Sequence, residues 1–93
     1  MMTAALMRGA RGLLGWSQSD LAAATGLSLP TIKRMEGPIG PGRSSADNVT
    51  AVRRAFENAG IEFIPENGGG EGVRFRQRRD DRQIAPELNA NEQ

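Results

Sequence analysis

The sequence predicts a mainly α-helical domain of four short helices followed by a β-hairpin. Up to residue 60, apolar residues recur at the three- and four-residue spacing of amphipathic helices, with serine and glycine at their expected ends. Beyond residue 60, two short runs of β-branched and aromatic residues flank a glycine-rich segment that contains Asn-Gly. A chain of 93 residues is long enough for only one hydrophobic core, so we expect a single domain.

The first helix is expected over residues 3–14. Leu6 and Ala10 lie four residues apart and belong to one apolar face. Gly9 and Gly12 interrupt the helix, and each lowers helix stability by about 1 kcal/mol relative to alanine. The first helix should therefore depend on packing against the rest of the domain.

The second and third helices are expected over residues 18–25 and 29–36. Ser17 and Ser28 precede them and are suited to cap their first turns, because a serine hydroxyl accepts a hydrogen bond from a free backbone N–H. Gly26 can adopt the left-handed conformation that ends the second helix in a tight turn. This pattern predicts two helices joined by a very short connection.

The fourth helix is expected over residues 46–59, after a loop at 37–45 that is rich in proline and glycine. Val52 and Phe56 lie four residues apart on its apolar face, and Gly60 is suited to end it.

Two short strands are expected over residues 61–64 and 73–75. An isolated hairpin is only marginally stable in water, so it should pack on the helices or pair with the hairpin of a second subunit. The segment that follows is charged and polar and is expected to be disordered. The predicted organisation is a helical unit over residues 1–60, a hairpin over 61–76 and a tail over 77–93.

The composition argues against several classes of function. Cysteine and histidine are absent, which removes thiolate nucleophiles, the usual zinc ligands and the commonest general base, so no enzyme, metal or cofactor is expected. No apolar run is long enough to cross a bilayer, and Arg8 and Arg11 interrupt the first apolar stretch, so we expect a cytoplasmic protein without a membrane partner. Residues 1–60 carry seven basic and four acidic side chains, a balance compatible with phosphate binding.

A pattern of DNA-binding proteins runs from the second predicted helix to the end of the third. The positions that carry it are Gln18, Leu21-Ala22, Gly26, Ser28, Thr31-Ile32, Arg34 and Glu36-Gly37. On these residues the chain resembles the Cro/cI-type, or XRE-family, helix-turn-helix regulators over about residues 4–60. The resemblance implies a four-helix, lambda-repressor-like DNA-binding domain, an ion pair between Arg11 and Glu36, and a third helix that enters the major groove.

The resemblance also implies which residues contact DNA. The base-facing positions are Leu29, Pro30 and Arg34, with Lys33 at their flank, and the phosphate-facing positions are Gln18, Ser28, Thr31 and Arg43. Leu29 and Pro30 depart from the polar residues of many relatives and offer only apolar contacts, for instance to a thymine methyl group. Arg34 is therefore the main candidate for base readout, since a guanidinium can donate two hydrogen bonds to guanine. For the phosphate set, helix capping or plain solvation is the alternative explanation.

Two functions remain open at this point. The first is a dimeric transcriptional repressor or autoregulator that binds double-stranded DNA at an inverted repeat, because one recognition helix covers too few base pairs to select a genomic site. The second is an antitoxin or another interaction module that binds a toxin or second regulatory protein through the hairpin or tail. Such a module would bind DNA only to control its own promoter.

Overall fold

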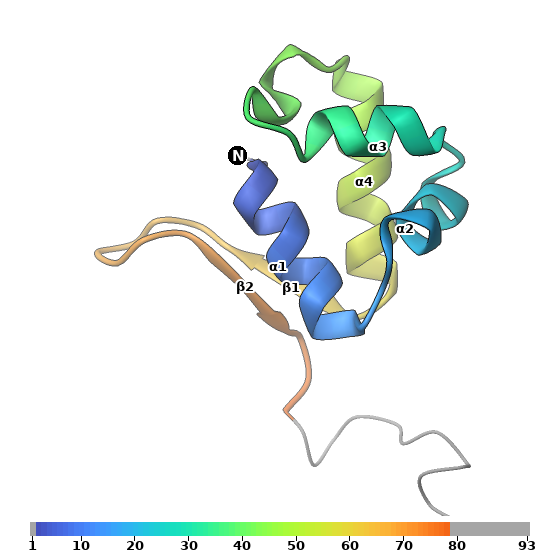
Figure 1. The fold of residues 1–93 in the computed structure, drawn as a ribbon. Helices are drawn as coiled ribbons and strands as arrows, with labels where there is room; N and C mark the ends of the chain where they lie inside the picture. Colours follow the sequence, from blue (N-terminus) through green and yellow to red (C-terminus); the bar gives the residue numbers. More distant parts are fainter. Residues whose placement is uncertain (1, 79–93) are drawn as a thin grey trace, which may run out of the picture.

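The computed structural model describes residues 2–78, which form a compact, mainly helical domain with a hairpin after four α-helices (Figure 1). In chain order the elements are α1 (Ala4–Leu14), α2 (Gln18–Thr25), α3 (Leu29–Met35), the 3-10 helix η1 (Gly40–Arg43), α4 (Ala46–Asn58), β1 (Ile61–Ile64) and β2 (Gly72–Phe75). The predicted order of helices and strands is confirmed, and each predicted bound lies within one residue of the observed one. From residue 79 onward, the tail expected to be disordered lies outside the described residues.

The prediction of a plain loop at residues 37–45 was incomplete, because this stretch contains η1. Pro41 stands in the first turn of η1, where its fixed φ favours helical geometry. The backbone N–H of Ser44 then donates to the Pro41 carbonyl at 2.9 Å and closes the turn. The segment after α3 is therefore an ordered turn that carries Arg43.

Each α-helix begins at a hydroxyl side chain that accepts a hydrogen bond from its first turn. Thr3, Ser17, Ser28 and Ser45 are the four capping residues. At Ser17 the cap is reciprocal, because Asp20 also accepts from the Ser17 backbone N–H at 2.9 Å. These caps satisfy backbone donors that would otherwise lack a partner, which explains why the helix starts were predictable.

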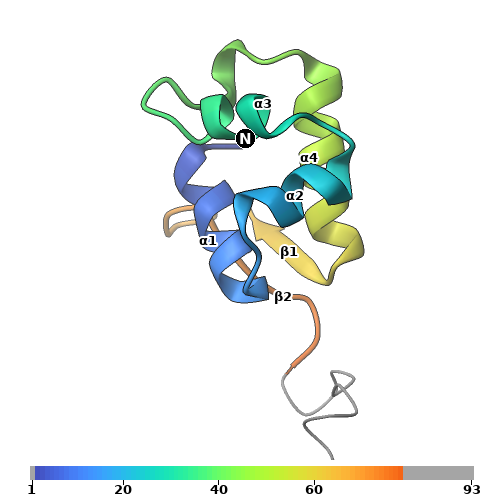
Figure 2. The same ribbon diagram turned by 45° about the vertical axis from the view of Figure 1, so that its right-hand side comes forward.

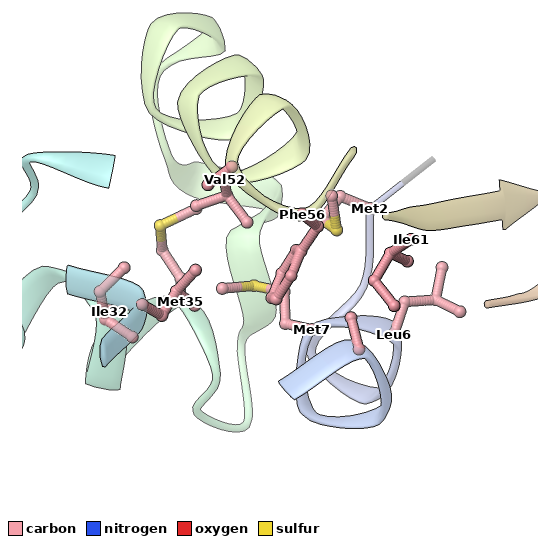
Figure 3. Close-up of a cluster of buried hydrophobic side chains, with 11 residues drawn as sticks. Met2, Leu6, Met7, Ile32, Met35, Val52, Phe56 and Ile61 are labelled. Carbon is pink, nitrogen blue, oxygen red and sulfur yellow. The ribbon is translucent and has the colours of Figure 1, made fainter. Parts of the chain in front are cut away.

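The core lies where α1, α3, α4 and β1 meet around Phe56 (Figure 3). Trp16 stacks on Phe56 with ring centroids 5.8 Å apart, and Phe63 meets the same ring at 6.1 Å. The buried apolar residues are Met2, Leu6, Met7, Ala10, Leu21, Ile32, Met35, Val52, Ala55, Phe56 and Ile61. One continuous core thus joins the helical unit to the hairpin.

The hairpin packs on the helical unit through one of its two faces. β1 and β2 are antiparallel, with Ile61 opposite Phe75 and Phe63 opposite Val73. β1 packs mainly on α4 and β2 on α1. At Gly9 of α1, a Cβ atom would stand 3.4 Å from Val73 Cγ2, so this glycine lets the strand lie close to the helix.

Among residues 2–78, no helix combines the length and the apolar character that a membrane span requires.

Candidate nucleic-acid interface

The helices α2 and α3 pack against each other, and α3 lies on the side of the domain away from the hairpin (Figures 1 and 2). The chain turns between them at Gly26, whose φ of 76° lies in the left-handed region that favours glycine. Leu21, Ile32 and Met35 are fully buried and anchor the pair to the core. One face of α3 is thereby fixed inside the domain and the other is presented to solvent.

A buried ion pair fixes the end of α3 to α1. Arg11 donates to both carboxylate oxygens of Glu36 at 2.8 Å, and the Glu36 side chain is only 2% exposed. Gln18 adds a third hydrogen bond, from Nε2 to Glu36 Oε1 at 3.1 Å, and Arg8 donates to the Glu36 carbonyl at 2.8 Å. The hydrogen bonds to Glu36 raise the pKa of Arg11 against the opposing effect of burial, so the guanidinium stays charged. The ion pair that the resemblance implied is present.

Three of the four base-facing candidates are solvent-exposed on α3. Pro30, Lys33 and Arg34 are exposed, whereas Leu29 is half-buried at the start of the helix. Pro30 stands in the first turn, where the missing N–H leaves no helical hydrogen bond unmade. The exposed face of α3 therefore presents an apolar first turn and a basic last turn.

The phosphate-facing candidates lie in three different settings. Gln18 is half-buried and bonds Glu36, as described above. Ser28 caps α3, accepting from the Thr31 N–H at 3.2 Å, and the two hydroxyls share a hydrogen bond of 2.8 Å. Arg43 is exposed on η1. Capping thus accounts for the observed bonds of Ser28 and Thr31, and Arg43 keeps a free charged end.

A hollow of about 320 Å³ opens between α3, η1 and the first turn of α4. It brings Arg34 and Arg43 to a single site, although the two lie nine positions apart in the sequence. The residues lining the hollow are Arg34, Ile39, Gly40, Arg43, Ser44, Ser45 and Asn48. This lining suits a phosphate, because it combines two cations, the first turn of a thirteen-residue helix, and hydroxyl and amide groups.

Sequence reasoning missed several members of this site. Ile39 is 67% exposed, the most exposed large apolar residue of the described chain, and Ser45 and Asn48 belong to the start of α4. No motif marks these positions. Their proximity to Arg34 follows only from the fold of η1, which the sequence pattern did not indicate.

Apart from Arg78, the basic side chains of residues 2–78 divide into two groups. The first group forms hydrogen bonds or ion pairs with carboxylates or backbone carbonyls and lies outside the hollow: Arg8, Arg11, Arg53, Arg74 and Arg76. Lys33, Arg34, Arg43 and Arg54 make no hydrogen bond or ion pair with any residue in 2–78. Three of these four unpaired cations lie on α3 and η1. An unneutralised positive charge is therefore concentrated at this end of the domain.

No group of three or more potential ligand side chains is placed to hold a metal ion within residues 2–78. The chain matches no protein-family model, and no curated protein resembles it significantly.

Proposed function

We propose that the protein is a sequence-specific DNA-binding regulator of the Cro/cI helix-turn-helix type, a dimeric repressor or autoregulator that reads an inverted repeat. The observation that supports this function most is the set of unpaired cations on α3 and η1, Lys33, Arg34 and Arg43. A cation without an internal partner keeps its charge and its donors available to a phosphate. The cations on α1 and β2 and Arg53 on α4 are engaged by carboxylates or carbonyls, and Arg54 is the remaining unpaired one on α4.

In this proposal the exposed face of α3 enters the major groove, which is about 12 Å wide and admits one helix. Pro30 and Leu29 contact thymine methyl groups, and Lys33 and Arg34 contact base edges or the adjacent backbone. The hollow beside α3 receives a phosphate, with Arg43 on one side and the first turn of α4 on another.

Arg34 is available to two partners in this arrangement. Its position on the exposed face of α3 favours guanine, whereas its place in the lining of the hollow favours a phosphate that it shares with Arg43. The two roles differ in their consequences. Loss of a base contact reduces discrimination between sequences, and loss of a phosphate contact weakens all binding equally.

The experiment starts from a selected duplex, obtained by repeated binding of the protein to a pool of randomised DNA. Fluorescence anisotropy then compares this duplex with a scrambled one for the wild type and for Arg34→Ala. We expect Arg34→Ala to weaken binding to the selected duplex by about 10-fold or more, as for a lost bidentate contact worth about 1–3 kcal/mol.

Arg54→Ala is the matched control, because Arg54 is also exposed and unpaired but lies on α4 outside the hollow. Its affinity for the selected duplex should stay close to that of the wild type. Failure of the selection to enrich any sequence, together with equal weak binding to all duplexes, would contradict the proposed function.

A second candidate function is the binding of a protein partner, as an antitoxin does. It is favoured by a second hollow, of about 270 Å³, between the start of α1, α4 and the hairpin. Leu6, Phe63, Ile64 and Pro65 give this hollow an apolar lining, and Arg53, Glu66 and Glu71 add charge. Co-expression with the product of a neighbouring gene, followed by copurification, tests this candidate against the first.

A further inference from the structure

Two serines line the hollow beside α3 together with its two arginines. Ser44 and Ser45 join η1 to α4. Both belong to the lining that also contains Arg34 and Arg43. The loop that carries the serines runs across the top of the domain in both views of the ribbon (Figures 1 and 2). A phosphoryl group attached to one of these hydroxyls would therefore meet a positively charged site of the same chain.

Of the two serines, Ser45 is the accessible one. Ser45 is exposed, whereas Ser44 is half-buried and its backbone N–H donates to the Pro41 carbonyl at 2.9 Å. The Ser45 hydroxyl oxygen accepts from the Asn48 N–H at 3.2 Å and donates no hydrogen bond within residues 2–78. A modifying enzyme can therefore reach the Ser45 hydroxyl on the folded domain.

The two arginines of the hollow are available to a phosphate at this position. Arg34 and Arg43 are exposed, and neither makes a hydrogen bond or an ion pair within residues 2–78. A guanidinium presents its donors in a planar fork that matches the oxygens of a phosphate. Asp47 is the acidic residue nearest to Ser45 in the sequence, but it is exposed and does not line the hollow. The charged side chains of the lining are therefore all positive.

We propose that Ser45 is a phosphorylation site whose phosphate is held by Arg34 and Arg43, and that this modification switches off DNA binding. The reaction transfers the γ-phosphoryl group of a nucleoside triphosphate. The Ser45 oxygen forms the new bond to phosphorus, the bond to the leaving nucleoside diphosphate breaks, and a base of the kinase takes the hydroxyl proton. The switch rests on the proposed function, because it fills the site proposed for a DNA phosphate.

Charge and tethering give the physical basis of the switch. A phosphoserine carries a charge of about −1.5 to −2 near pH 7, which offsets the charge of the two guanidinium groups. The group is attached to the chain that forms the site, so it competes with DNA as an intramolecular ligand. A contact with a DNA phosphate carries no sequence information. Phosphorylation should therefore weaken binding to selected and scrambled duplexes alike.

The first test measures stability without DNA. The full chain is prepared with phosphoserine at position 45, and its thermal unfolding is compared with that of the unmodified chain. We expect the phosphate to raise the unfolding temperature by about 4 °C or more, because it forms new charge-assisted hydrogen bonds. An unchanged unfolding temperature would overturn the proposal.

The double variant Arg34→Ala, Arg43→Ala separates the effect of the two cations from a general effect of phosphate at the start of α4. Both arginines are exposed and make no internal bond, so the double variant should fold. Phosphoserine at position 45 should raise its unfolding temperature by less than half of the rise in the wild type. An equal rise in the two would show that the hollow does not hold the phosphate.

Phosphorus magnetic resonance gives a direct readout of the same contact. The second pKa of a phosphoserine is about 6, so the signal of the phosphate shifts as the pH passes this value. Nearby cations favour the doubly charged form, so this pKa should be lower in the wild type than in the double variant. Equal pKa values in the two proteins would contradict the proposed pairing.

The second test measures DNA binding by anisotropy with the selected and scrambled duplexes. Phosphoserine at position 45 should weaken binding to both by about 10-fold or more, because a phosphate site is lost and negative charge is added. Phosphothreonine at position 50 is the matched control, since Thr50 is exposed on α4 outside the hollow. It should weaken binding less, and equal losses at the two positions would reduce the effect to added charge and refute the switch.

The two tests distinguish a failure of the switch from a failure of the proposed function. A held phosphate with unchanged DNA affinity would overturn the switch and leave the regulator in place. An unmodified protein that selects no DNA sequence would remove both the regulator and the switch. The unfolding and resonance measurements would then still decide whether Arg34 and Arg43 hold the phosphate of Ser45.

Discussion

At the scale of single residues, the position of α3 depends on one buried carboxylate. Glu36 ends α3, and its oxygens accept hydrogen bonds from Arg11 on α1 and Gln18 on α2. Three helices are thus joined at one side chain. The carboxylate is satisfied because the guanidinium binds both oxygens, and a buried charge without such partners would be costly.

We predict that Arg11→Ala destabilises the protein by about 3 kcal/mol or more, since it leaves Glu36 as a buried charge that only Gln18 still contacts. The matched control is Arg74→Ala, which removes the solvent-exposed pair with Glu62 and should cost less than about 1 kcal/mol. Urea denaturation followed by circular dichroism measures both free energies. Equal losses for the two variants would contradict the role assigned to Glu36.

At the scale of elements, helix ends are set by local chemistry and could be predicted from sequence. Each α-helix begins at a serine or threonine, and Gly15 and Gly26 end two of them in the left-handed conformation. These residue types act on neighbouring backbone groups, so a short stretch of sequence is enough to identify them. The turn of η1 was missed because prolines and glycines are equally common in irregular loops.

Two glycines of the helical unit should respond oppositely to alanine. Gly26 has a φ of 76°, so Gly26→Ala should lower stability by about 1–2 kcal/mol through backbone strain alone. Gly12 lies inside α1 without a positive φ, and a Cβ atom there meets nothing within 4 Å. Gly12→Ala should therefore raise stability by about 0.5–1 kcal/mol. Thermal unfolding of both variants against the wild type measures the two shifts, and a loss of stability in Gly12→Ala would contradict the argument.

At the scale of the whole molecule, α3 and the hairpin lie at opposite ends of the domain, and each end has its own charge pattern (Figure 1). The resemblance to helix-turn-helix regulators identified the exposed residues Pro30, Lys33 and Arg34 of α3, although Leu29, which it also named, is half-buried. It could not predict that Arg34 and Arg43 line one hollow with Ile39 and Asn48, because that contact depends on how η1 folds back. The hydrogen bond from Gln18 to Glu36 was missed for a similar reason, because the two residues lie 18 positions apart in the sequence and meet only in the folded domain.

The last prediction concerns the salt dependence of DNA binding. Each phosphate neutralised by the protein contributes about 0.9 to the slope of log affinity against log salt concentration, because it releases condensed counterions. Arg43 is exposed, unpaired within residues 2–78 and part of the lining of the hollow proposed to hold a phosphate. Arg43→Ala should therefore reduce the slope by about 0.9 per subunit bound and weaken selected and scrambled duplexes alike. Arg54→Ala, which lies outside the hollow, should keep the wild-type slope. Anisotropy titrations at four salt concentrations measure the slopes, and an unchanged slope in Arg43→Ala would show that the hollow beside α3 does not hold a phosphate.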